Sequence, residues 1–76
     1  MGQNKPIHTV PDGAGRWINR TEGAKRGFAP ASTKKDAEAA GRDAARRRHV
    51  EHISHRENGT IGERRSYGND PYPPKG

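Results

Sequence analysis

One stretch decides the fold: residues 33–48, with the sequence TKKDAEAAGRDAARRR. Thr33 followed three positions later by Asp36 predicts a helix start, with Thr33 as the N-cap and Asp36 reaching back as in a capping box. We expect the helix to run from Lys34 to Arg48. Its last turn carries three arginines, which complement the negative end of the helix dipole.

Small residues mark the face of this helix that should pack. Four of them recur at helical spacing: Ala37, Ala40, Gly41 and Ala44. A helix with such a face can lie close to a sheet. A glycine inside a helix costs roughly 1 kcal/mol relative to alanine. We therefore expect a bulky side chain, Trp17 or Phe28, to press against Gly41.

Short β-type runs lie on both sides of the helix. Residues 7–10 and 16–20 flank a segment dense in turn formers and predict a hairpin, in which Trp17 supplies the largest apolar surface. Residues 21–27 are expected to form a second turn, after which Phe28 returns to the core. Residues 50–55 and 60–65 flank Asn58-Gly59, a hairpin signal. The sequence predicts an α+β fold of order ββαββ, a small antiparallel sheet with the helix on one face and the other face open.

The chain divides into three predicted parts: a flexible leader at 1–6, the ββαββ domain at 7–65 and a tail at 66–76. Three prolines in the tail fix φ, so the segment loses little entropy on docking. We expect the tail to lie on the domain. Its candidate docking or interaction residues are Tyr67, Asp70, Tyr72 and Lys75.

Composition limits the core and the class of protein. The 76 residues include no leucine and no cysteine, so we expect a thin core without disulfides or thiolate metal sites, for which pairing with a second copy would help. No apolar run approaches the roughly 20 residues that cross a bilayer. These features predict a soluble, cytoplasmic protein with no membrane partner and no cofactor.

The net charge of +6 favours association with DNA or RNA. The candidate phosphate-binding side chains lie on the helix and on the last strand: Lys34, Lys35, Arg42, Arg46, Arg47, Arg48, Arg64 and Arg65. A solvated helix face explains such a charge run equally well. The alternative function is a protein-interaction module, such as a phage or accessory adaptor, that uses the open sheet face, self-association or the tail.

Metal binding and catalysis find little support in the sequence. His49, His52 and His55 recur every third residue, but on a strand His52 points away from the other two, so no metal site is expected. The serines lie in no nucleophile-elbow context and no pair of carboxylates has an evident pocket. We therefore expect a binding module and not an enzyme.

Several motifs resemble those of a small bacterial and phage family of unknown function, serial two-one-eight-eight. The family shows a His-x-Val-Pro start, a Gly-Trp strand, a Thr-x-x-x-Ala helix start, an Ile-His-x-x-x-Gly-x-Ile hairpin and a Tyr-Gly-Asn-Asp-Pro-x-Pro-Pro-Lys-Gly end. The matching residues are His8, Val10, Pro11, Gly15, Trp17, Thr33, Ala37, His55, Gly59, Ile61 and 67–76, with Arg16 inserted in the Gly-Trp pair. The resemblance implies a shared fold and no particular activity.

Four polar residues depart from what such strands should contain. They stand where larger apolar groups are expected: Thr9, Asn19, His52 and Ser54. Their presence predicts a monomer of low stability.

Overall fold

The computed structural model describes residues 5–67. Its single helix in that range, α1 (Lys34–Arg48), has the bounds that the sequence predicts. The Thr33 hydroxyl accepts a hydrogen bond from the backbone N–H of Asp36 at 3.3 Å, which confirms the N-cap. The helix ends at His49, which adopts a left-handed conformation with φ of 59° and donates its N–H to the carbonyls of Ala45 and Arg46.

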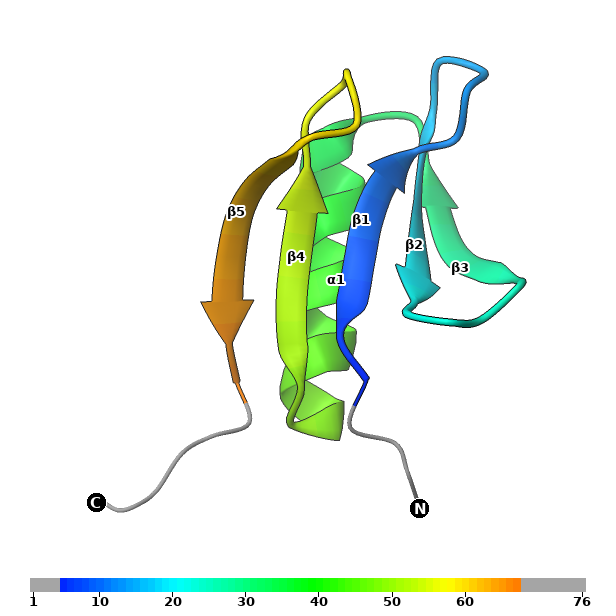
Figure 1. The fold of residues 1–76 in the computed structure, drawn as a ribbon. Helices are drawn as coiled ribbons and strands as arrows, with labels where there is room; N and C mark the ends of the chain where they lie inside the picture. Colours follow the sequence, from blue (N-terminus) through cyan, green and yellow to red (C-terminus); the bar gives the residue numbers. More distant parts are fainter. Residues whose placement is uncertain (1–4, 68–76) are drawn as a thin grey trace.

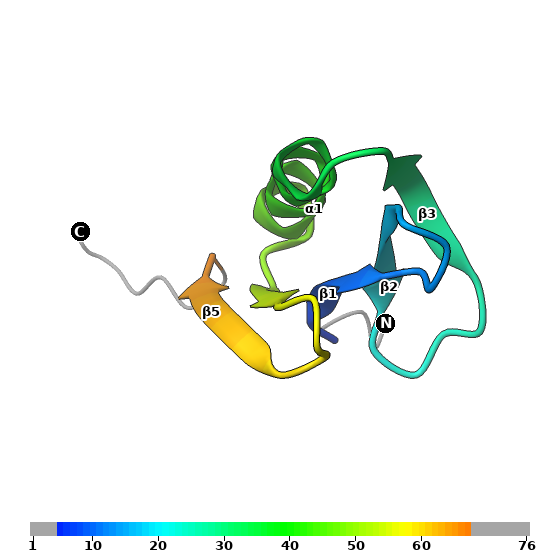
Figure 2. The same ribbon diagram turned by 90° about the horizontal axis from the view of Figure 1, so that it is seen from above.

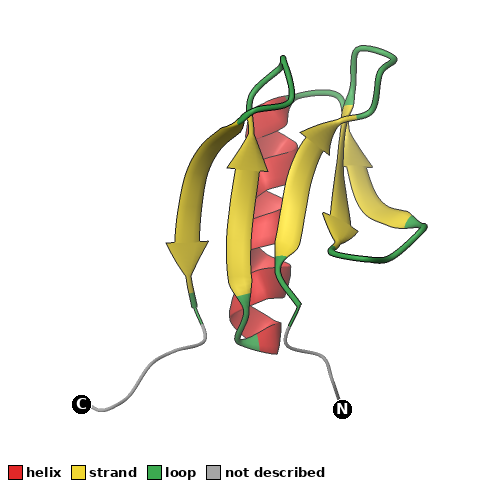
Figure 3. Ribbon diagram, in the orientation of Figure 1, coloured by secondary structure: helices red, strands yellow, loops and turns green. Residues whose placement is uncertain are grey.

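Five strands form one sheet: β1 (Ile7–Pro11), β2 (Trp17–Thr21), β3 (Gly27–Ala31), β4 (Glu51–His55) and β5 (Ile61–Ser66). Their order across the sheet is β3-β2-β1-β4-β5. The helix lies across one face of this sheet and leaves the other face open (Figures 1 and 3). The α+β class and the packing of one helix on one face are therefore confirmed.

Two details differ from the expected ββαββ arrangement. The segment around Phe28 forms a third strand, β3, which pairs with β2 through an irregular register. Its Pro30 is tolerated because β3 is an edge strand. The second difference is that β1 and β4 pair in parallel. The helix carries the chain back across the sheet, so β4 enters beside β1 in the same direction instead of through a hairpin.

The apolar core lies between α1 and the centre of the sheet. It contains Ile7, Ala44, Ala45 and Val50, with Phe28 and Tyr67 packed against it as partly buried side chains. Tyr67 is the one candidate tail residue within the described region, and its partly buried ring packs against this core. Asp70, Tyr72 and Lys75 lie outside the described residues, as does most of the predicted leader.

Strand β5 extends past the helix. The helix packs against β1 through β4 and, among these described elements, not against β5. Figure 2 shows β5 at the end of the sheet away from β3, with α1 above the middle of the sheet. All six residues of β5 are exposed, and Ile61 is the large hydrophobic side chain with the greatest exposure, 51%.

No helix within residues 5–67 is both long and apolar enough to cross a bilayer.

Candidate functional site

A cluster of polar side chains lies buried between the sheet and α1. Thr9 and Asn19 are completely buried and His52 is 3% exposed. The Thr9 hydroxyl oxygen lies 2.6 Å from Asn19 Oδ1 and 2.7 Å from His52 Nε2. These are three of the positions where the sequence predicted larger apolar groups, and their mutual hydrogen bonds explain how the fold accommodates them.

The directions of these hydrogen bonds follow from Asn19. Its amide nitrogen donates to two backbone carbonyls, at 2.9 Å to Ala37 and 3.4 Å to Ala29, so Oδ1 must face Thr9. Thr9 therefore donates to Asn19 and accepts from His52, whose Nε2 must carry its hydrogen. Burial disfavours the imidazolium and lowers the pKa of His52 below its usual 6.5.

Gly41 of α1 lies directly over this polar cluster. A Cβ on Gly41 would lie 2.8 Å from both Thr9 Oγ1 and His52 Nε2, and closer still to Asn19 Oδ1. The predicted close approach at Gly41 is therefore confirmed. The predicted partners, Trp17 and Phe28, are wrong.

Each of those two rings lies near a basic side chain instead. The Lys34 ammonium lies 5.3 Å from the Trp17 ring centroid, and the Arg48 guanidinium lies 5.3 Å from that of Phe28. On β4, Ser54 donates to the Glu38 carboxylate of α1. The polar groups on this side of the sheet thus serve to hold α1 in place.

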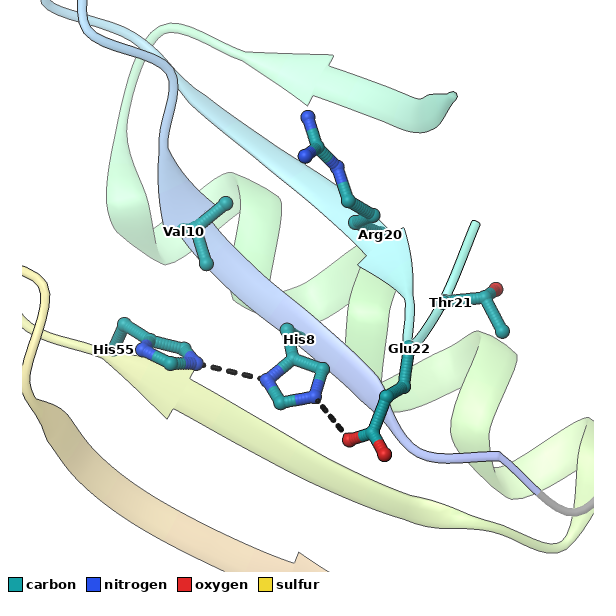
Figure 4. A pocket seen from close by; sticks show the side chains of 7 residues that line it. His8, Val10, Arg20, Thr21, Glu22 and His55 are labelled. Carbon is teal, nitrogen blue, oxygen red and sulfur yellow. Dashed lines mark hydrogen bonds and ion pairs between the residues drawn. The ribbon is translucent and has the colours of Figure 1, made fainter. Parts of the chain in front are cut away.

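On the open side of the sheet, two histidines from neighbouring strands meet. His8 Nδ1 on β1 lies 2.8 Å from His55 Nε2 on β4. The second nitrogen of His8 lies 3.0 Å from Glu22 Oε1, and that of His55 lies 3.1 Å from the Gly59 carbonyl oxygen. Figure 4 shows His55, His8 and Glu22 in a row along the sheet surface.

A solvent-facing hollow of about 320 Å³ adjoins this histidine pair. Its lining comes from β1, β2, the turn after β2, and β4: His8, Val10, Arg20, Thr21, Glu22, Gly23 and His55. The hollow combines the apolar side chain of Val10 with groups that can donate, accept or coordinate. It is the candidate functional site of the open face.

A family of uncharacterized proteins conserved in bacteria, DUF2188, has a model that matches residues 7–67. The chain belongs to the DUF2188 family. Searches of curated proteins and of solved structures gave no match. In this DUF2188 domain the two histidines of the open-face pair come from the His-x-Val-Pro and Ile-His-x-x-x-Gly-x-Ile motifs that carry the resemblance.

Four of the eight basic residues predicted to bind nucleic acid have partners within the DUF2188 domain. Lys34 lies 4.0 Å from the Glu38 carboxylate and Arg47 lies 3.0 Å from that of Asp43. Arg65 lies 2.9 Å from the Glu63 carboxylate. Arg48 donates to the Thr21 hydroxyl at 3.1 Å and lies over Phe28, so its role is in large part structural.

The other four predicted residues form no ion pair within residues 5–67: Lys35, Arg42, Arg46 and Arg64. The three helical ones are seven and four positions apart, which places them along one side of α1. We call them the basic stripe. Arg64 lies on β5, where it points to the opposite face from Arg65. The two strand arginines therefore do not extend a single surface.

The three histidines that the sequence singled out do not converge. His49 caps α1, His52 is buried and His55 faces the open side. Residues 5–67 contain no cluster of three or more potential metal ligands. Sequence reasoning missed the pairing of His55 with His8, because the two are 47 positions apart and only the parallel pairing of β1 with β4 brings them together.

Proposed function

We propose that this DUF2188 domain is a non-enzymatic module that binds nucleic acid through the basic stripe of α1. The observation that supports this proposal is that Lys35, Arg42 and Arg46 share one side of the helix and have no acidic partner within residues 5–67. The neighbouring acidic side chains have other partners: Glu38 accepts a hydrogen bond from Ser54, and Asp43 forms an ion pair with Arg47. The stripe therefore presents three cationic side chains that form no ion pair within residues 5–67.

The length of the stripe suits a phosphate backbone. Lys35 and Arg46 are eleven positions apart on the helix, a rise of about 16 Å at roughly 1.5 Å per residue. Duplex DNA presents several phosphates over that distance. Contacts of this kind fix position on the nucleic acid and carry no sequence information, so the proposal is for binding without strong sequence preference.

A salt series with two triple variants tests the proposal. Fluorescence anisotropy with labelled duplex DNA and single-stranded RNA would give the slope of log K against log salt concentration. Replacing Lys35, Arg42 and Arg46 by alanine should weaken DNA binding and reduce the slope by about 3, since each phosphate contact contributes about 0.9.

The matched control removes the same formal charge from paired positions: Lys34→Ala, Arg47→Ala and Arg65→Ala. This variant should keep most of the slope. Equal losses in both triple variants would show that only net charge matters. Absence of binding to either nucleic acid at low salt would overturn the proposal.

Strand β5 favours a second candidate function, protein interaction by self-association. Its backbone forms an exposed edge that can pair with another strand. In an antiparallel pairing of two β5 strands centred on Arg64, Glu63 stands opposite Arg65 of the second copy on the same face of the sheet, which gives two pairs of opposite charge. We propose this β5 pairing as the form that self-association takes.

Light scattering after size-exclusion chromatography tests this candidate with a charge swap. Arg65→Glu should weaken the dimer, and combining it with Glu63→Arg should restore it. A wild-type chain that remains monomeric at all concentrations would rule the pairing out.

A further inference from the structure

We propose that His8 and His55 together bind a divalent transition-metal ion of the zinc class on the open face of the sheet. The ligand atoms would be His8 Nδ1 and His55 Nε2, the two nitrogens that face one another across β1 and β4 at 2.8 Å. This site lies on the opposite face of the sheet from the helix, and its existence does not depend on nucleic-acid binding.

The first argument comes from the outer nitrogens of the pair. His8 Nε2 lies 3.0 Å from a Glu22 carboxylate oxygen and His55 Nδ1 lies 3.1 Å from the Gly59 carbonyl oxygen. Both oxygens can only accept, so both outer nitrogens carry hydrogens. Histidines that ligate a metal almost always donate their other N–H to a carboxylate or a backbone carbonyl. Here each of the two histidines has one of these two acceptors.

The second argument comes from the inner nitrogens. At 2.8 Å there is room for one hydrogen between them, so at least one of the two presents a lone pair to the other. In a tetrahedral zinc site with Zn–N bonds of about 2.0–2.1 Å, two ligand nitrogens lie about 3.3 Å apart. The rings are already tilted by 40°. For a metal ion to replace the bridging hydrogen, the distance between the two inner nitrogens has to increase by only about half an ångström.

The third argument comes from the surroundings of the pair. The hollow of about 320 Å³ gives space for waters at the remaining coordination positions, and no third ligating side chain within residues 5–67 completes the set. An ion held by two imidazoles and water keeps exchangeable positions. Arg20 lines the same hollow, so a small anion such as phosphate could bind the ion beside that guanidinium.

Zinc titration of the full-length, tag-free chain tests the site. Imidazole resonances followed by NMR should show saturation at one Zn²⁺ per chain, with shifts at His8 and His55 and none at His49 or His52. His8→Ala and His55→Ala should each abolish saturable binding. Mg²⁺ should give no shift, because it prefers oxygen ligands.

Two further variants separate this site from adventitious binding. Glu22→Gln keeps both imidazoles but weakens the acceptor behind His8, and should reduce zinc affinity about 10- to 100-fold. His49→Asn removes an exposed imidazole while Asn still tolerates the left-handed backbone, and should leave affinity unchanged.

Three results would overturn the proposal: no saturation at millimolar zinc, saturable binding that survives either alanine variant, or binding lost in His49→Asn. Circular dichroism establishes that each variant is folded. If an alanine variant does not fold, the wild-type resonance shifts decide the question, since shifts confined to His49 or His52 contradict the site.

Discussion

On the side of the sheet that faces the helix, His52 is almost fully buried and donates to Thr9, whereas on the open side His8 and His55 meet beside a solvent-facing hollow. The two sides draw on the same two strands: Thr9 and His8 lie on β1, and His52 and His55 lie on β4. The buried hydrogen bonds have fixed directions and no room for another group. On the open side, the two histidines can give up their mutual hydrogen bond and bind a ligand instead.

This difference teaches how burial assigns a role to a polar residue. A buried donor or acceptor that loses its partner costs the domain about 1–3 kcal/mol, so each member of the inner cluster is held in place by the fold. An exposed ion pair contributes about 0–1 kcal/mol, so the outer cluster adds little stability. We expect substitutions on the two faces to have separate consequences.

The largest effect is expected for Gly41→Ala. The new methyl group would collide with Thr9, Asn19 and His52, and overpacking typically costs 1–3 kcal/mol. We expect a loss of about 3 kcal/mol in a denaturant melt, although alanine is the better helix former. As a control, Ala39→Gly at an exposed helical position should cost about 1 kcal/mol. If the Gly41→Ala domain were more stable than the wild type, Thr9, Asn19 and His52 would have to shift easily to make room for the methyl group.

Next in size is Thr9→Val, which keeps the shape and removes the hydroxyl. Asn19 Oδ1 and His52 Nε2 would then lose their common partner, at a cost of about 2 kcal/mol in the free energy of unfolding. Thr9→Ser retains the hydroxyl and should cost about 1 kcal/mol for the missing methyl group. Equal costs for the two variants would contradict the hydrogen-bond scheme.

Lowering the pH should reduce the free energy of unfolding through His52, which lies on the side of the sheet that faces the helix. Burial lowers its pKa in the folded domain, so below the unfolded value of 6.5 the unfolded chain binds more protons than the folded one. Stability should therefore fall as pH decreases from neutral through 6.5 toward the lowered pKa, and be retained above 6.5. Denaturant midpoints measured across this range check the trend. His52→Gln should flatten it, and an unchanged slope in that variant would assign the effect to other groups.

The smallest change in stability is expected for His8→Ala on the open side. Its hydrogen bond with the Glu22 carboxylate is exposed on the carboxylate side, so the unfolding free energy should change by about 0–1 kcal/mol. Zinc binding should be lost in the same variant. If His8→Ala costs as much as Thr9→Val, the outer histidine pair is a structural element and the contrast between the faces fails.

Local patterns predicted the helix well. Thr33, Asp36 and the arginine-rich last turn act within a few residues of each other, and they give the observed bounds of α1. The need for a small residue at Gly41 was also readable from sequence. The groups that require it were not, because Thr9, Asn19 and His52 come from three separate strands.

The remaining features depend on contacts between distant segments. Strand β3 was missed because its sequence, GFAPA, is weak in strand formers and contains a proline; its pairing with β2 and the Asn19 contact to Ala29 stabilise it. The parallel partnership of β1 and β4 has no hairpin signal in the sequence. Because the sequence does not reveal that pairing, it could not predict that His8 lies beside His55 or that a hollow adjoins the two histidines.

The parallel pairing of β1 with β4 also bears on how quickly the domain assembles. It joins positions such as Ile7 and His52, which are 45 residues apart in the chain, at the middle of the sheet. Contacts over such separations slow folding, since the loop must close before the pairing stabilises anything. The hairpin of β1 and β2 can form early, but β1 keeps an unpaired edge until β4 has been synthesised. An unpaired edge of this kind is a template for pairing with other strands, so we expect the β1 edge to be the place where an incompletely synthesised chain is most open to wrong pairing.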